Sequence, residues 1–341
     1  MLTKILTRLM QGENLSAETT EQIVERIMSE EISPVLIASF LTALRAKGET
    51  TAELVGAARA MRNRAIRIPH QHPLLIDTCG TGGDGSGTFN ISTTAAFVLA
   101  AAGLTVGKHG NRSISSRSGS ADVLEALGAR IDLTPAQVAT CIERVGIGFM
   151  FAPHLHPAMK AVGPVRKELG FRTIFNMLGP LTNPAGATHQ VIGVFAADCV
   201  AVMARAAAEL GAHNVFVVHN ECGLDELATC GVSCVVQVTN GTVRTFEVIP
   251  EEHRLARCDI TDLAGGDPVT NAEITRRIFD GEPGPAANTV ILNAALGLVC
   301  AEAANSLDDG IALARETIAG GRARQKLSEF IAFTNEASRA A

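Results

Sequence analysis

From residue 74 onward, short apolar runs alternate with segments that have the pattern of helices. The apolar runs have the length of buried strands and occupy residues 74–77, 104–107, 147–152, 190–196 and 215–219. This alternation is typical of a mostly parallel sheet that helices cover on both faces. Residues 230–250 are predicted to form an antiparallel hairpin that turns at Asn240-Gly241, and the chain is predicted to be helical again from Ala286.

Residues 1–70 contain no strand pattern and are predicted to form a small all-helical domain. Ser16 is expected to cap a helix whose apolar stripe contains Ile23 and Ile27, and further helices are expected to begin at Pro34 and Thr51. We therefore predict an α/β protein with a small all-helical domain, residues 1–70, and a larger α/β domain, residues 71–341. Ser120 is expected to cap a helix that ends at Gly128, and Thr134 to cap another.

The composition excludes several classes of protein. A hydrophobic content of 47% excludes intrinsic disorder, and a net charge of −6 argues against a nucleic-acid partner, since such binding depends on neutralising phosphates. The longest apolar run, residues 95–106, is shorter than the ~20 residues that span a membrane. Because Lys4 and Arg8 interrupt the first apolar segment and the eight cysteines are scattered, we expect reduced thiols, no membrane partner and a cytoplasmic location.

The segment DTCGTGGDGSGTFNIST, residues 77–93, contains five glycines within eight positions, after a strand and before a helix. Glycine lets backbone N–H groups approach phosphate oxygens, and the helix N-terminus adds partial positive charge. Asn90, Ser92 and Thr93 supply further donors. A connecting turn in which Ser92 only caps the helix is the alternative, but the glycine density and the strand–loop–helix context favour phosphate binding.

Two common nucleotide-binding motifs do not fit this segment. Gly80, Gly82 and Gly85 match G-x-G-x-x-G, but no Asp or Glu lies between Gly85 and residue 121 to bind a ribose. A Walker A loop also fails, because Lys108 is followed by His109 rather than by Ser or Thr.

A second loop, GKHGNRSISSRSGSAD at residues 107–122, also follows a strand and precedes a helix. Lys108, His109, Arg112 and Arg117 lie within ten residues, among Asn111 and several serines. Cationic and hydroxyl donors at the end of a strand suit a highly charged phosphate ligand. A solvated basic loop is the alternative.

Asp225 and Glu226 lie side by side in the loop after the strand at 215–219. Such a pair can bind Mg²⁺, which takes a few carboxylates together with water and phosphate oxygens. Taken alone, surface acids are the commoner interpretation, but a pyrophosphate ligand requires a divalent cation. His219, Cys222, Cys230 and Cys234 lack the C-x-x-C spacing that is typical of zinc sites, so zinc is disfavoured.

Arg166 lies on a short predicted helix after Gly163-Pro164. Its planar guanidinium suits a carboxylate ligand, although a surface arginine explains this segment equally well. His154 and His156 are two residues apart, which is not the spacing of a helical metal-binding pair, so we interpret them as structural or substrate-lining.

The segments GTGGDGSGTFNIST, KHGNRSISSRSGSADVLEALG and RTIFNMLGPLTNPA, with the GLDE turn, together resemble the anthranilate phosphoribosyltransferases of tryptophan biosynthesis. The resemblance extends to about residue 330. It implies transfer of the 5-phosphoribosyl group from phosphoribosyl diphosphate to the amine of anthranilate, with Mg²⁺ as cofactor. It also implies an active site between the domains, a homodimer through the helical domains, and a return of residues 160–185 to the helical domain.

The resemblance also implies site residues. Lys108 would be the catalytic residue, stabilising charge on the departing diphosphate. Magnesium contacts would be Ser92, Asp225 and Glu226, and anthranilate contacts would be Gly80, Asn111 and Arg166. The implied phosphoribosyl diphosphate contacts are Gly80, Gly83, Asp84, Thr88, Asn90, Ile91, Ser92, Thr93, Lys108, His109, Gly110, Asn111, Arg112, Ser113, Ile114, Ser115, Ser116 and Ser120.

Two other functions share this predicted architecture. A pyrimidine nucleoside phosphorylase resembles this chain in its basic loop but carries KHGGR where this chain has KHGNR, so that Asn111 discriminates between them. A nucleic-acid-binding homologue of the same fold is expected to carry a basic groove, which the net charge disfavours.

Overall fold

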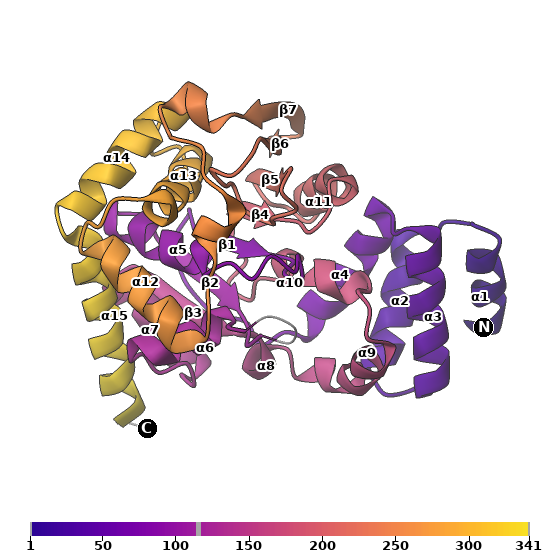
Figure 1. The fold of residues 1–341 in the computed structure, drawn as a ribbon. Coiled ribbons are helices and arrows are strands. Elements are labelled where there is room, and N and C mark those ends of the chain that lie inside the picture. Colours follow the sequence, from indigo (N-terminus) through magenta and orange to yellow (C-terminus); the bar gives the residue numbers. More distant parts are fainter. Residues whose placement is uncertain (1, 114–116, 340–341) are drawn as a thin grey trace.

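The computed structural model describes residues 2–113 and 117–339, which form a helical part beside a larger α/β part (Figure 1). The helical part begins with α1 (Leu2–Met10), α2 (Ala17–Met28), α3 (Pro34–Lys47) and α4 (Thr51–Arg64). The predicted cap is confirmed, since the Ser16 hydroxyl accepts a hydrogen bond from the Thr19 N–H at 3.2 Å. Thr50 and Glu53 form a reciprocal capping box at the start of α4.

The sheet of the α/β part has the order β3-β2-β1-β4-β5-β6-β7. The first five strands in that order pair in parallel, and β6 and β7 pair antiparallel, which confirms the mostly parallel sheet and the hairpin at Asn240-Gly241. The strands are β1 (Ile76–Gly80), β2 (Val106–Gly110), β3 (Ile147–Phe151), β4 (His189–Gly193), β5 (Asn214–Asn220), β6 (Ser233–Thr239) and β7 (Thr242–Val248).

β1 and β2 each begin two residues later than the predicted runs 74–77 and 104–107. The strands were predicted from their apolar residues. In the structure, backbone pairing extends both strands beyond the apolar residues into the polar segments DTCG and GKHG. The beginnings of both candidate loops are therefore held within the sheet.

Helices cover both faces of the sheet (Figure 1). α12, which begins after the Asp267 cap, is a helix that the sequence analysis did not predict. The remaining helices are α5 (Ile91–Ala101), α6 (Ser120–Leu127), α7 (Pro135–Val145), α8 (Ala152–Leu155), α9 (Gly163–Leu169), α10 (Ile174–Leu181), α11 (Asp198–Glu209), α12 (Pro268–Phe279), α13 (Pro285–Cys300), α14 (Leu307–Ala319) and α15 (Arg322–Arg339), with 3-10 turns at Pro157–Ala161, Pro250–His253 and Ile260–Leu263.

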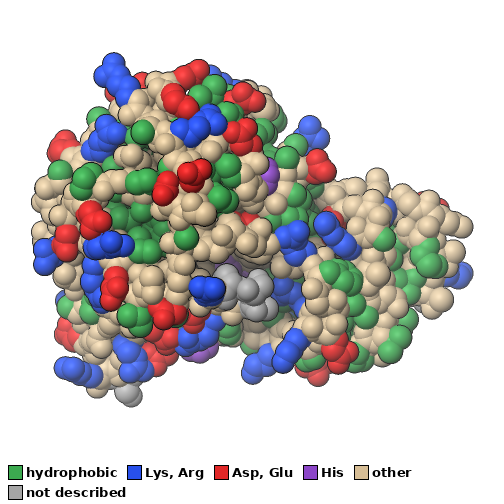
Figure 2. All heavy atoms as spheres, in the orientation of Figure 1, with side chains coloured by type: hydrophobic (Ala, Val, Ile, Leu, Met, Phe, Trp, Pro, Cys, Tyr) green, Lys and Arg blue, Asp and Glu red, His purple; other side chains and the backbone are tan. Residues whose placement is uncertain are grey.

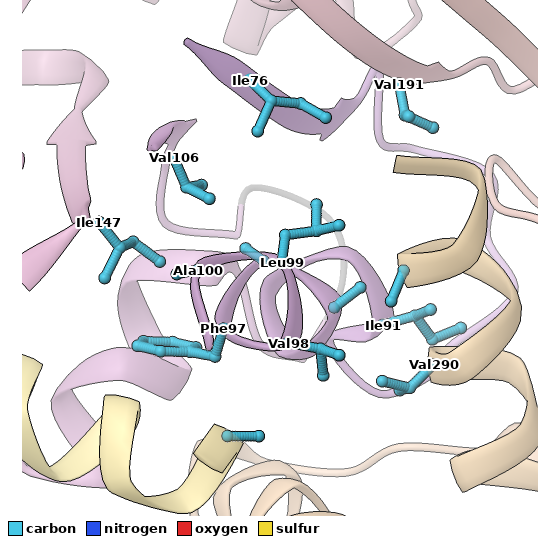
Figure 3. Packing of buried hydrophobic residues seen from close by; sticks show 14 of the residues in the cluster. Ile76, Ile91, Phe97, Val98, Leu99, Ala100, Val106, Ile147, Val191 and Val290 are labelled. Atoms are coloured by element: carbon cyan, nitrogen blue, oxygen red, sulfur yellow. The ribbon is translucent and has the colours of Figure 1, made fainter. Parts of the chain in front are cut away.

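Each face of the sheet packs against its own apolar core, because successive side chains of a strand point to opposite faces. On one face, Ile76, Val106 and Val191 pack on α5 (Figure 3). On the other face, Ile192 and Val217 belong to a core that continues into the helical part. The sheet and the helical part are therefore parts of one packed structure.

α9 and α10 lie far from α1–α4 in sequence but pack against them. Val165 of α9 and Leu178 of α10 share a buried cluster with Phe40 of α3. The Arg62 guanidinium of α4 also donates to the carbonyls of Leu181 and Leu210, each at 2.7 Å. Among the described helices, none is both long enough and apolar enough to cross a membrane.

The Ser120 cap predicted for α6 is wrong. Gly119 is the capping residue, and the carboxylate of Asp122 accepts a hydrogen bond from its N–H at 2.9 Å. A side chain at position 119 would collide with the backbone at residues 111–113, since a Cβ there would lie 2.4 Å from the Ser113 nitrogen. The predicted end of α6 at Gly128 is confirmed, and so is the predicted cap of α7 at Thr134.

A buried ion pair in the helical part provides a test of this packing. The Glu53 carboxylate is fully buried and accepts hydrogen bonds from the Lys47 ammonium at 3.0 Å and the Leu15 N–H at 2.9 Å. We expect Glu53→Ala to lower the free energy of unfolding by about 3–5 kcal/mol, because breaking one side of a buried pair leaves the other charge uncompensated. Urea denaturation measures this change.

Glu31→Ala is the matched control, since Glu31 pairs with Arg26 at 3.1 Å on the surface. Its effect should be about 0–1 kcal/mol. Equal losses for the two variants would contradict the assignment of Glu53 as a buried structural anchor.

Candidate active site

The predicted site segments meet at the carboxyl edge of the parallel sheet. After β1 the chain continues to β2 and β3 on one side of β1, and it then returns to form β4 on the other side. In open α/β sheets, ligands bind in the crevice at such a reversal, outside the carboxyl ends of the strands. β1 ends at Gly80 and β4 ends at Gly193, and these two residues are paired in the sheet.

The glycine-rich loop after β1 has a backbone that only glycine adopts readily. Gly82, Gly83, Gly85 and Gly87 all have positive φ, between 63° and 77°. Asp84 shapes the loop from within, since its carboxylate accepts hydrogen bonds from the N–H and hydroxyl of Ser86 at 3.1 and 2.7 Å. These four glycines present little but backbone at the surface, as phosphate binding requires.

Asp225 lies directly against the ends of β1 and β4. Its carboxylate accepts a hydrogen bond from the Gly82 N–H at 2.8 Å. A Cβ at Gly80 would lie 2.4 Å from the Asp225 Oδ2, and a Cβ at Gly193 would lie 1.6 Å from the Asp225 backbone oxygen. Both glycines are therefore required for this approach.

Glu226 lies at the N-terminus of α5, beside the amine of Lys108. Its Oε1 accepts a hydrogen bond from the Ser92 N–H at 3.1 Å. The nearly buried Lys108 donates to the Thr78 carbonyl at 2.5 Å and approaches the Ser92 hydroxyl at 3.5 Å. The structure thus brings together Ser92, Lys108 and Glu226, which the sequence placed in three separate segments.

The electrostatics of Asp225 and Glu226 favour a bound cation. Burial raises the pKa of Asp225, and the neighbouring Asp84 adds to this shift. Burial also raises the pKa of Glu226, with the charge of Asp225 as the next contribution. Crowded carboxylates that resist ionisation fit a divalent cation, whose charge would stabilise both as anions.

The donor set fits Mg²⁺ better than zinc. In the part of the chain that the structure describes, no three His, Cys, Asp or Glu side chains are arranged to hold a metal. Mg²⁺ commonly takes one or two carboxylates and completes its shell with water and ligand phosphates. The cysteines considered for zinc are free thiols, and the Cys222 thiol donates to the Cys230 carbonyl at 3.4 Å.

His109 directs its ring away from the loop surface. The ring Nδ1 lies 3.1 Å from the Gly179 carbonyl of α10, and the ring centroid lies 5.1 Å from that of His156. Burial lowers the pKa of His109 to about 3 and that of His156 to about 4, so both rings are neutral at pH 7. The His109 ring is thus buried against α10.

Arg112 pairs with acids of α6. Its guanidinium lies 2.9 Å from Asp122 and 2.5 Å from Glu125. The adjacent Asn111 is exposed, and its N–H donates to the Ser120 hydroxyl at 3.1 Å.

Other predicted contacts differ in how much of the side chain is accessible. The Ile91 side chain belongs to the core beneath the sheet (Figure 3), and Thr93 is nearly buried. The Thr88 hydroxyl lies 3.3 Å from the Ser86 hydroxyl. Ser113 donates its N–H to Asp122 at 3.0 Å. The predicted contacts Ile114, Ser115 and Ser116 lie outside the described residues.

Arg166 of α9 is half-buried, with its guanidinium 5.9 Å from the centroid of the Phe175 ring. Burial lowers the pKa of Arg166, and no acid forms an ion pair with it within residues 2–113 and 117–339. A partly buried guanidinium without a carboxylate is suited to bind an anionic ligand. Figure 2 shows Lys and Arg side chains gathered where the helical part meets the α/β part.

The sequence analysis missed several residues that hold the site together. The buried Asp77 carboxylate accepts hydrogen bonds from the His109 N–H at 3.2 Å and from the Asn183 amide at 2.8 Å. Arg172 donates to the Gly83 carbonyl and lies 4.2 Å from the centroid of the Phe195 ring. Asp77 begins the segment DTCGTGGDGSGTFNIST and Arg172 begins RTIFNMLGPLTNPA, but nothing in the spacing of either residue indicated these distant partners.

The fold and site define a glycosyl transferase of the class built from a helical bundle and an α/β domain. Residues 3–65 match the model described as "Glycosyl transferase family, helical bundle domain", and residues 72–324 match "Glycosyl transferase family, a/b domain". The chain belongs to this family.

Several relatives that match over their full length share one name. The chain is 52% identical to anthranilate phosphoribosyltransferase of Anaeromyxobacter dehalogenans, over 98% of this chain and 99% of that protein. It is 50% identical to that of Acetivibrio thermocellus, over 98% and 97% of the two chains. The crystal structure of the Thermus thermophilus enzyme superposes with a TM-score of 0.91 at 46% identity, covering 97% and 99%.

A more distant structure gives the same result. Anthranilate phosphoribosyltransferase from Saccharomyces cerevisiae, in complex with phosphoribosyl diphosphate and Mg, superposes with a TM-score of 0.90 at 28% identity over 98% of both chains. The chain is therefore a member of the anthranilate phosphoribosyltransferases.

The close approach at Gly193 predicts the effect of a single methyl group. We expect Gly193→Ala to displace the Asp225 backbone and to weaken binding of diphosphate in the presence of Mg²⁺ by about tenfold or more, measured by calorimetry. Gly148→Ala on β3 is the control, since its Cβ would meet the Ile142 side chain at 2.5 Å and the Val138 carbonyl at 3.2 Å, both on α7 rather than on the segment that carries Asp225. Unchanged diphosphate affinity in the Gly193 variant would show that the placement of Asp225 does not matter for binding.

Proposed function

We propose that this chain transfers the 5-phosphoribosyl group from phosphoribosyl diphosphate to the amine of anthranilate, giving N-(5-phosphoribosyl)anthranilate and diphosphate in tryptophan biosynthesis. The observation that carries the proposal is the convergence of a carboxylate pair and a glycine-rich loop at the end of β1 and β4. Full-length membership of the family supports it.

We propose the roles predicted above for the described residues. The glycine-rich loop and the loop after β2 would hold the diphosphate and ribose, and Ser92, Asp225 and Glu226 would hold Mg²⁺. The yeast structure with phosphoribosyl diphosphate and Mg supports magnesium use. Bound Mg²⁺ would neutralise part of the negative charge on the diphosphate.

The chemistry depends on stabilising negative charge that develops on the departing diphosphate. Lys108 and the amides of the glycine-rich loop are proposed to supply this stabilisation, which the position of the Lys108 amine near the Ser92 hydroxyl and the positive φ of the loop glycines support. Holding both reactants in line supplies a further part of the rate enhancement. An arylamine attacks in its neutral form, so the site needs no strong general base.

Arg166 is proposed to bind the anthranilate carboxylate. It lies on α9, which packs against the helical part, and has no ion-pair partner among the residues the structure describes. The yeast enzyme in complex with 4-fluoroanthranilate, a benzoate of the same kind, supports a carboxylate ligand in this family. The two substrates would then be held by different parts of the chain.

The remaining predictions stay proposals. The packing of α9 and α10 against α3 supports residues 1–70 as a helical domain to which residues 160–185 return, with 71–341 as the α/β domain. Exposed Met10 and Val35 on α1 and α3 support a homodimer through the helical domains. A cytoplasmic location is proposed because the eight cysteines are free thiols.

The function is tested by mixing the protein with Mg²⁺, phosphoribosyl diphosphate and anthranilate and following anthranilate fluorescence. The chain contains no Trp and no Tyr, so its own emission is very weak. We expect anthranilate to be consumed only when both other components are present. Excess EDTA should abolish turnover, and added Mg²⁺ should restore it.

Undiminished turnover in EDTA would contradict the proposed requirement for Mg²⁺. Phosphorolysis of thymidine, or salt-dependent retention on DNA, would instead support the phosphorylase or the nucleic-acid-binding homologue.

Arg166→Ala separates the two substrates. Charge-assisted hydrogen bonds are worth about 1.5–3 kcal/mol, so the anthranilate KM should rise by about ten- to a hundredfold. The affinity for phosphoribosyl diphosphate should change little, and Arg166→Lys should restore the KM only in part, because lysine lacks the planar fork. Steady-state kinetics with each substrate varied in turn measures both effects; equal losses for the two substrates would assign Arg166 to general support of the site.

A further inference from the structure

Asp225 and Glu226 lie in an irregular segment between β5 and β6, so something outside regular backbone pairing must hold them in place. Asn220 closes the base of this segment. Its fully buried amide donates to the Gly231 carbonyl and to the Ser233 hydroxyl, both at 2.9 Å. The Asn220 N–H also donates to the Leu224 carbonyl at 3.0 Å, and its amide donates to the Ala228 carbonyl at 3.4 Å, so Asn220 supports the segment from its base, on either side of the carboxylate pair.

Asn293 of α13 pairs with the residue that follows Glu226. Its Oδ1 accepts a hydrogen bond from the Leu227 N–H at 3.1 Å, and its Nδ2 donates to the Leu227 carbonyl at 2.7 Å. Both backbone groups of Leu227 are thus bound by one side-chain amide. The same Nδ2 donates to the Thr289 carbonyl at 2.9 Å, which fixes the orientation of the amide.

Thr289 lies one turn earlier on the same face of α13 and reaches the same segment. Its fully buried hydroxyl lies 3.0 Å from the hydroxyl of Thr229. Asn293 and Thr289 together therefore contact residues 227 and 229, immediately after the carboxylate pair. Asn293 also lines a small cavity with Glu226 and Ser92.

The helix that carries these two side chains is almost entirely buried and apolar. Val290 of α13 packs in the same core as Phe97 and Leu99 of α5 (Figure 3), the helix whose N-terminus faces Glu226. A buried amide in such a helix costs free energy unless its hydrogen bonds are made. Asn293 directs those bonds to the segment that carries the carboxylate pair.

We propose that Asn293, assisted by Thr289, is a positioning residue that sets the Asp225–Glu226 turn for magnesium binding. The proposal rests on the function proposed above, because it takes these carboxylates as the metal ligands. Residues that orient metal ligands without touching the metal commonly change metal affinity by about ten- to a hundredfold when they are replaced.

The test compares Asn293→Ala and Thr289→Val with a matched control, Asn214→Ala. Asn214 is equally buried, and its amide donates to the Cys300 carbonyl at 2.8 Å, but it lies at the opposite end of β5 from the carboxylate turn. Two quantities are measured: the Mg²⁺ concentration that half-saturates anthranilate consumption, and the calorimetric affinity for inorganic diphosphate in Mg²⁺. The anthranilate KM at saturating Mg²⁺ is measured alongside.

We expect Asn293→Ala to raise the half-saturating Mg²⁺ concentration by about tenfold, Thr289→Val to raise it by about threefold, and Asn214→Ala to leave it unchanged. The anthranilate KM should stay near that of the parent in all three. A parental Mg²⁺ requirement in the Asn293 variant, or an equal rise in the Asn214 variant, would overturn the proposal.

If Asn293→Ala does not fold, Thr289→Val decides the question, because it preserves side-chain volume and removes only the hydroxyl. In that case an unchanged Mg²⁺ requirement in Thr289→Val would overturn the proposal. A parent protein that fails to consume anthranilate would refute the proposed function, and the diphosphate affinities would still show whether Asn293 positions the carboxylates.

Discussion

The site depends on the close approach of the Asp225 backbone to the paired ends of β1 and β4. Gly80 and Gly193 make that approach possible because neither has a side chain to occupy the space. Once Asp225 lies there, its carboxylate binds the Gly82 N–H and Glu226 reaches the N-terminus of α5. Three chain segments far apart in the sequence are thereby joined at one edge of the sheet.

The same approach determines the electrostatics of the crevice. Asp84, Asp225 and Glu226 lie close enough for like charges to disfavour ionisation, and the nearby cation, Lys108, is already hydrogen-bonded to the Thr78 carbonyl. A divalent cation would relieve the repulsion, and an anionic ligand would then compensate the charge of that cation and meet the loop amides. Cation and diphosphate are therefore expected to bind cooperatively.

Local features of this chain were predictable from sequence because they depend on nearby residues. The Ser16 and Thr134 caps and the Asn240-Gly241 turn follow from short-range hydrogen bonding and backbone preference. The bond between Ser92 and Glu226 spans 134 residues, and that between Leu227 and Asn293 spans 66. Only the topology of the sheet brings such partners together, so the motifs revealed which residues matter but not what holds them.

The two parts of the molecule carry the different charges that the proposed reaction requires. The α/β part carries the carboxylates and the glycine-rich loop, whereas α9 carries Arg166, the proposed anthranilate ligand, which has no acidic partner in the described chain. Arg172 links the parts directly, since its guanidinium donates to the Gly83 carbonyl while it stacks on Phe195. A change in the glycine-rich loop on binding a diphosphate would alter that link. The segment between α9 and α10, which follows Arg166, would therefore respond to a ligand bound at the glycine-rich loop.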